Sequence, residues 1–187
     1  MLLVFCAVFS IFAQSNKSFS WTMGLQNMRT GELVPFSAPV QSWTGEQFRL
    51  VIETQTQAYC YVIAESAAGN EMAVLYAGRL ASGEVWYSQI LQLSPPRGSE
   101  SLFVIVCAEE QRTLAQRITA FNANSGTAQR RALLNEIQSV RSNASRFREA
   151  PEKPVLMGGA SRGGPERSQG VEYSGSEIYI KTVSIDH

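Results

Sequence analysis

Between Gly45 and Glu110 the chain consists of short apolar runs that are separated by glycine, proline and asparagine. The runs are rich in valine, isoleucine, tyrosine and phenylalanine, which favour strands. Short strands that alternate with turn residues are typical of an antiparallel sheet folded into a sandwich. We therefore predict a mainly β fold, an antiparallel β-sandwich, with strands at residues 46–53, 58–65, 71–76, 85–90 and 101–108.

The strand pattern begins before this region. Residues 19–25 alternate between apolar and polar, so their apolar side chains share one face of a strand. Residues 33–36 are a predicted edge segment, because Pro35 has no N–H to donate to a neighbouring strand. We assign residues 16–122 to the sandwich.

Two tryptophans in this region have two possible roles. Trp21 and Trp43 are candidates for an aromatic platform that contacts a sugar or another ligand. Alternatively, Trp21 lies in the core, because it belongs to the alternating apolar face, and Trp43 covers one end of the sandwich.

Composition limits the chemistry that the protein can perform. The 187 residues carry 16 Lys and Arg and 16 Asp and Glu, a formal net charge of zero, so we expect no nucleic-acid partner. Three Cys and one His without paired ligand spacing predict no metal site. Phosphate-loop, dinucleotide and serine-hydrolase motifs do not occur, so we expect no cofactor and no catalytic residues.

The N-terminal residues resemble a secretory signal. Residues 2–13 are apolar and would span ~18 Å as a helix, too short for a ~30 Å hydrocarbon core. Ala13-Gln14-Ser15 has small residues at its first and third positions, as a signal-peptidase site requires. We predict that residues 1–15 are cleaved and that the protein is periplasmic or secreted. A buried N-terminal strand or helix is the alternative, and Cys6, which lacks small residues before it, is not expected to carry a lipid.

Several stretches of the predicted sandwich resemble a bacterial domain family of unknown function, the one numbered 4384. They are Gly45-Glu-Gln-Phe-Arg-Leu-Val-Ile-Glu53, Ala58-Tyr-Cys-Tyr-Val-Ile63, Gly69-Asn-Glu-Met-Ala-Val-Leu-Tyr76 and Pro95-Pro-Arg-Gly-Ser-Glu100. Ala58 stands where the family prefers glycine, and Tyr76-Ala77 replaces its Phe-Pro. The resemblance implies an envelope-associated or extracytoplasmic module, often beside other domains, and it supplies no catalytic residues.

Cys60 and Cys107 both lie inside predicted strands. In an oxidising compartment a disulfide between them would close a long loop and stabilise the fold. Alternatively, they are two buried thiols that pack as small apolar residues. A thiol enzyme would pair one of them with His187, but this residue ends the chain and is expected to be mobile.

The sequence after the sandwich predicts helices, a loop and a strand. Residues 114–121 permit a short helix, and residues 127–147 have a clear apolar stripe and an arginine-rich face. We assign residues 123–170 to a helix followed by a flexible basic insert, since 149–170 are rich in proline, glycine and serine. The basic insert either contacts a membrane surface or carries a helix that docks on the sandwich. Residues 171–187 are a final strand that returns to the sandwich.

These expectations favour an exported, non-enzymatic β-sandwich module that binds a protein in the bacterial envelope. One alternative is a structural subunit that assembles through an edge strand, for which residues 33–36 and the final strand are candidates. The other alternative is a hydrolase or thiol enzyme. The ligand, the partner and the oligomeric state do not follow from the sequence.

Overall fold

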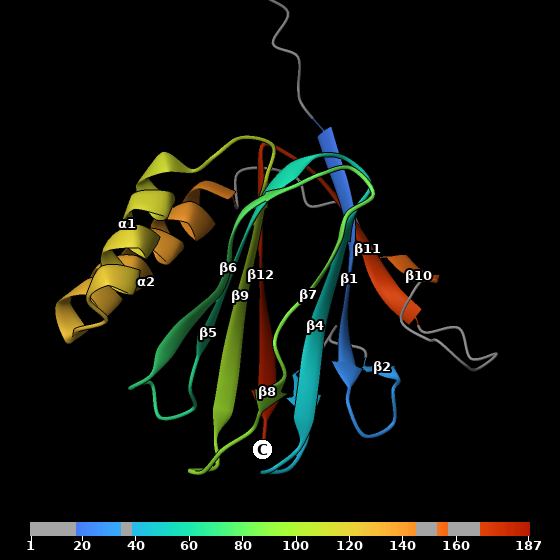
Figure 1. Ribbon diagram of the computed structural model, residues 1–187, viewed down its shortest axis with the longest axis vertical. Helices are drawn as coiled ribbons and strands as arrows, with labels where there is room; N and C mark the ends of the chain where they lie inside the picture. The colour runs from blue at the N-terminus through green and yellow to red at the C-terminus, as the bar shows by residue number, and fades with distance from the viewer. Residues whose placement is uncertain (1–17, 35–38, 145–152, 157–168) are drawn as a thin grey trace, which may run out of the picture.

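In the computed structural model, two sheets face each other and a pair of helices covers the outer side of one of them (Figure 1). The structure describes residues 18–34, 39–144, 153–156 and 169–187. The predicted mainly β sandwich is therefore confirmed. The predicted signal segment, Cys6 and most of the predicted basic insert after the helix lie outside the described residues.

The first sheet, called sheet A, has seven strands among the described residues, in the order β10-β11-β1-β4-β7, with β2 beside β1 and β8 beside β4. All of its paired strands are antiparallel. The strands are β1 (Ser18–Asn27), β2 (Leu33–Val34), β4 (Gln47–Thr54), β7 (Val85–Tyr87), β8 (Leu91–Gln92), β10 (Lys153–Leu156) and β11 (Gln169–Ser176).

The second sheet, called sheet B, has five strands among the described residues, in the order β3-β12-β9-β5-β6. They are β3 (Val40–Gln41), β5 (Ala58–Glu65), β6 (Met72–Leu80), β9 (Ser99–Cys107) and β12 (Ile178–Asp186). Only the short pairing of β3 with β12 is parallel. The prediction that residues 58–65 form a central strand is confirmed, because β5 lies between β9 and β6.

The core between the sheets follows from the alternation of apolar side chains. The apolar face predicted for β1 points inward and is almost completely buried. Trp21 is the largest side chain there, stacked on Phe19 and Tyr173 with ring centroids 5.2 and 5.3 Å away. Its ring also meets Tyr179 edge-on at 4.8 Å. This aromatic cluster therefore ties together β1, β11 and β12, from both sheets.

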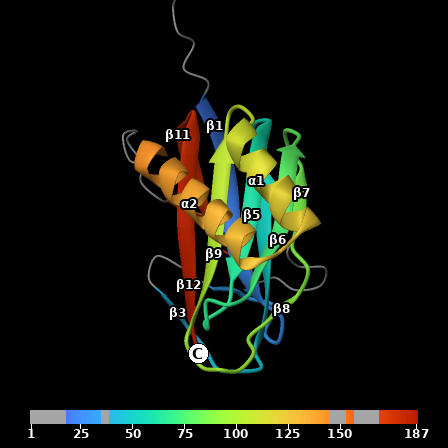
Figure 2. The same cartoon turned by 90° about the vertical axis from the view of Figure 1, so that its left-hand side faces the viewer.

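A second core lies between sheet B and the helices α1 (Arg112–Ala123) and α2 (Thr127–Ala144), which cross the outer face of the sheet (Figure 2). The helices bury the apolar stripes expected from their sequence. This layer explains why β5 and β9 are apolar on both faces. The buried residues of this core are Tyr61, Ile63, Phe103, Ile105, Cys107, Leu114, Ile118, Phe121, Leu133, Ile137 and Val140.

Arginines of α2 help to hold the helix on the sandwich. Arg130 donates a hydrogen bond to the carbonyl of Gly69, and Arg141 donates one to the hydroxyl of Thr182. The alternative in which this helix docks on the sandwich is therefore the one that the structure contains. No helix among the described residues is long and apolar enough to cross a membrane.

The structure differs from the sequence prediction in three strand assignments. The predicted strand at 85–90 ends at Tyr87 as β7, and β8 begins only at Leu91, because the Ser88 hydroxyl accepts the Leu50 N–H at 3.0 Å and interrupts the ladder. The range 149–170, predicted as a loop, contains β10 and the start of β11, and its residues 149–152 and 157–168 lie outside the described part. Residues 171–187 contain two strands, β11 in sheet A and β12 in sheet B. The glycines and serines of β11 have little preference for a strand, so this strand forms because it pairs with β1.

Candidate functional site

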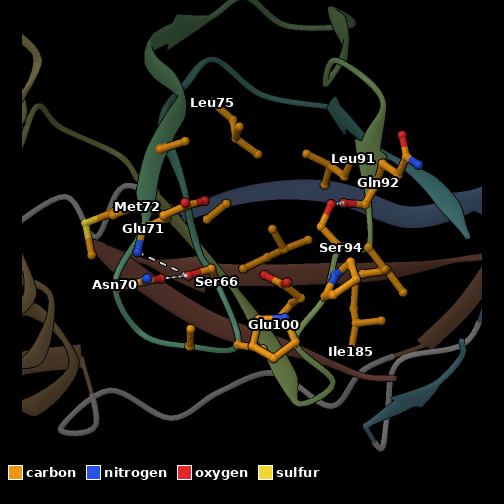
Figure 3. A pocket seen from close by; sticks show the side chains of 18 of the residues that line it. Ser66, Asn70, Glu71, Met72, Leu75, Leu91, Gln92, Ser94, Glu100 and Ile185 are labelled. Carbon is orange, nitrogen blue, oxygen red and sulfur yellow. Dashed lines mark hydrogen bonds between the residues drawn. The ribbon is translucent and has the colours of Figure 1, made fainter. Parts of the chain in front are cut away.

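A pocket of about 460 Å³ lies where the two sheets part, between β6 of sheet B and β8 of sheet A (Figure 3). Its lining comes from the end of β5, the turn that follows, the first half of β6, residues 89–96 and the facing ends of β9 and β12. The volume is within the range of pockets that bind small molecules or single side chains of a partner.

The walls of the pocket are apolar and its rim is polar. The apolar side chains belong to the core between the sheets or pack against it, so the pocket opens that core to solvent; they include Leu75, Leu91, Leu93, Leu102 and Ile185. Ser66, Asn70 and Glu71 form one side of the rim. Figure 3 shows the carboxylate of Glu100 between this rim and β8.

A β-bulge in β6 directs the side chain of Leu75 into the pocket. In the pairing of β5 with β6, Val62 faces Tyr76 but the next residue, Ile63, faces Val74, so Leu75 is an extra residue. Val74 packs toward the helices, whereas Leu75 and Tyr76 both pack toward the core between the sheets. In a regular strand, either Leu75 or Tyr76 would point toward the helices. The bulge therefore turns Leu75 into the pocket.

The turn between β5 and β6 is fixed by its own hydrogen bonds. The N–H of Glu71 donates to the Ser66 hydroxyl at 3.1 Å, and that hydroxyl donates to Asn70 Oδ1 at 3.2 Å. The N–H of Gly69 donates to the Ser66 carbonyl at 2.8 Å, and a φ of 63° at Gly69 suits glycine. This turn, predicted at residues 67–70, holds the rim of the pocket in place.

His187 lies behind Glu100, inside the protein. Its backbone N–H and C=O both pair with Gly98, each at 3.0 Å, and its side chain is 0% exposed. The expectation of a mobile His187 is therefore wrong, because this pairing continues the contact between β12 and β9 to the last residue. Nδ1 lies 3.1 Å from the Thr44 hydroxyl, and Nε2 lies 3.6 Å from Oε1 of Glu100.

Cys60 and Cys107 are free thiols and do not form the disulfide that the sequence left as one of two possibilities. Cys107 is paired with Tyr59, the residue before Cys60, so the two thiols point to opposite faces of sheet B. Cys60 lies in the core between the sheets and Cys107 lies under the helices. The alternative of two buried thiols describes the structure.

We expect neither thiol to react in the folded protein. Burial raises the pKa of Cys60 to about 12 and also raises the pKa of Cys107, so the reactive thiolate is scarce at about pH 8. In the chain without residues 1–15, which lacks Cys6, Ellman's reagent should label neither cysteine in the native protein and both after unfolding. A disulfide would instead leave the unfolded, unreduced protein unlabelled and would lower its mass by two hydrogens.

The structure separates the two tryptophans: Trp21 lies in the core, as the second alternative expects, and the two rings do not form a shared aromatic platform. Trp21 is 0% exposed and therefore cannot contact a ligand. Trp43 is 57% exposed, and the guanidinium carbon of Arg29 lies 5.1 Å from the centre of its ring. Arg29 is also 3.2 Å from Glu46, so this pair is part of an ion-paired corner of the sandwich.

The predicted edge segments are not the longest free edge in the described structure. Leu33 and Val34 form a two-residue strand beside β1, and β12 pairs with β9 on one side and with β3 at Ile185 and Asp186 on the other. At the other side of sheet B, β6 is the last described strand and presents nine residues. The sequence reasoning missed this edge, and it missed Glu100, for which the only signal was a carboxylate just after the Pro95-Pro96 corner.

Comparisons with known proteins give no match: no protein-family model, no curated protein and no solved structure is similar to this chain. Among the described residues, no group of three or more His, Cys, Asp or Glu is arranged to hold a metal ion. Function is therefore inferred from the pocket and the edge beside it.

Proposed function

We propose that the protein is an exported, non-enzymatic binding module of the bacterial envelope, and that its pocket receives an extended segment of a partner protein. The observation that supports this most is that the outer edge of β6, the last described strand of sheet B, borders the pocket. Unpaired N–H and C=O groups of an edge can bind the backbone of an added strand. Alternate side chains of that strand would then enter the pocket between the sheets.

Export is supported by the apolar residues 2–13 and the small residues at Ala13 and Ser15. The resemblance to family 4384 implies an envelope-associated module, and we therefore propose that the partner is an envelope protein. A mature protein isolated from the periplasm should begin close to Asn16. Contact of the basic insert with a membrane surface is a secondary proposal, and it concerns the part of the chain after α2.

A hydrolase is the second candidate, because Thr44, His187 and Glu100 place a hydroxyl, an imidazole and a carboxylate in a row. Binding is favoured over hydrolysis by the position of the pocket. Of these three residues only Glu100 lines it, so a bound substrate would meet the carboxylate and not the hydroxyl.

The test is a selection of ten-residue peptides from a random display library against the chain without residues 1–15. We expect extended peptides whose addition shifts backbone amide signals of β6 and residues 89–96 in NMR spectra. The Ala73→Arg variant places a bulky cation at an exposed pocket residue and should weaken binding about tenfold or more. The same change at Ala120, exposed on α1, is the matched control and should leave affinity unchanged.

Three outcomes would contradict the proposal. If no peptide is selected, or the shifts lie elsewhere, the pocket does not receive an extended segment. If the chain itself associates through β6, the structural-subunit alternative holds. If mass spectrometry shows that the peptides are cleaved, the hydrolase candidate holds.

A further inference from the structure

We infer that the pocket selects a lysine or arginine side chain of the bound segment, and that Glu100 is the residue that recognises it. This inference rests on the proposed function, because it names the side chain that an extended partner would place between the sheets.

The charged side chains that line the pocket are all negative. Its lining contains two carboxylates, Glu71 and Glu100, and neither lysine nor arginine. Two basic groups close to the rim have other contacts: Arg130 donates to the carbonyl of Gly69, and His187 lies behind Glu100. Arg97, which follows Pro96, is exposed and is not part of the lining. A cation that enters the pocket would therefore meet two carboxylates without a competing lysine or arginine in the lining.

The carboxylate of Glu100 is held with one oxygen toward the protein and one available to a ligand. Oε1 lies 3.6 Å from Nε2 of His187, a buried nitrogen that has no hydrogen-bond partner among the described residues. Nδ1 of the same ring is occupied by the Thr44 hydroxyl. No described residue donates a hydrogen bond to Oε2, and the side chain of Glu100 is 21% exposed. Figure 3 shows this carboxylate directed into the pocket.

The rest of the pocket fits the stem of a basic side chain. Lysine and arginine carry aliphatic stems that pack on apolar surface while the charged end remains hydrogen-bonded. Leu75, Leu91 and Ile185 supply that surface around Glu100. A purely apolar side chain would bury the carboxylate without a partner, and an acidic one would face two like charges.

The experiment compares two versions of a peptide obtained in the selection above, one with lysine and one with norleucine at the position that enters the pocket. Norleucine has the same stem without the charge. With the parent protein we expect the lysine peptide to bind about tenfold more tightly, and added salt to reduce the difference. In the Glu100→Gln variant, which keeps the size but not the charge, the two peptides should bind equally. Glu110→Gln, an exposed position beyond the other end of β9, is the matched control and should keep the preference.

The results separate this inference from the proposed function. Equal affinity of both peptides for the parent protein, with shifts on β6, would overturn the inference and leave the proposed function standing. A lysine preference that persists in Glu100→Gln would overturn the role of Glu100. If that variant does not fold, two measurements on the parent protein test the inference instead. Added salt should reduce the preference for lysine, and a peptide with glutamate at the same position should not bind. If no peptide binds at all, both proposals fail.

Discussion

Replacing Trp21 with alanine is expected to lower the free energy of unfolding by about 3–5 kcal/mol, against a total of roughly 5–15 kcal/mol for a domain of this kind. The ring is completely buried and touches Phe19, Tyr173 and Tyr179. Its removal leaves a cavity at the point where β1, β11 and β12 meet. Urea unfolding followed by far-UV circular dichroism measures the loss as a lower midpoint.

The matched control is Trp43→Ala. That side chain is more than half exposed, and its interaction with Arg29 is worth about 0.5–1 kcal/mol at an exposed site. We therefore expect a shift of the midpoint several times smaller than for Trp21→Ala. Equal shifts for the two variants would mean that the aromatic cluster does not stabilise the sandwich as described.

A chain that ends at Gln169 is expected to lose cooperative folding. It lacks nearly all of β11 and the whole of β12, which runs beside β9 and carries Tyr179, Val183 and Ile185 into the core. Without them, β1 and β9 each expose an unpaired edge and apolar side chains. Thermal unfolding without a sharp transition, together with aggregation on size-exclusion chromatography, is the expected result. A truncated chain that melts like the parent would show that β11 and β12 are not needed for the sandwich.

A chain that ends at Ile185 is a smaller truncation, which removes only Asp186 and His187. From the sequence alone, removal of Asp186 and His187 is expected to have no effect. The structure predicts a measurable loss, because Ser42 donates to the Asp186 carbonyl at 2.8 Å and Gly98 pairs with His187 twice. With a net contribution of about 0.5–1.5 kcal/mol for each of these three hydrogen bonds, we expect a loss of about 1.5–4.5 kcal/mol and a transition that remains cooperative. A midpoint equal to that of the parent would show that these contacts do not stabilise the protein.

The sequence predicts the elements whose local pattern agrees with their surroundings. Residues 19–25 alternate because one face of β1 lies in the core, and the stripe of α2 repeats because one side of the helix lies on sheet B. The same logic fails for β11, whose glycines and serines favour a loop until β1 lies beside it. The local sequence pattern therefore predicts a helix or strand correctly where buried residues recur with the period of that element. It does not predict a strand that forms only because a neighbouring strand pairs with it.

The candidate site was harder to predict because its residues come from distant parts of the chain. Glu100 meets His187 only through the register of β9 with β12, and Thr44 joins them from the loop after β3. The cysteines illustrate the same difficulty. Since β5 and β9 are apolar on both faces, their sequences do not show which face each thiol occupies, and the helix layer supplies that information.

The chain crosses between the two sheets at both ends of the sandwich. The chain passes from sheet A to sheet B through the single residue Glu177, and it passes from sheet B to sheet A in the short connection between β6 and β7. Both passages lie at the same end of the molecule in Figure 1, and the Tyr76 and Trp86 rings touch near the second, 5.1 Å apart. The pocket lies toward the opposite end, beside β8. At that end the chain crosses from β8 in sheet A to β9 in sheet B through residues 93–98, and residues 93–96 of this connection line the pocket. A segment that binds in the pocket would therefore contact a connection that joins the two sheets as well as the sheets themselves.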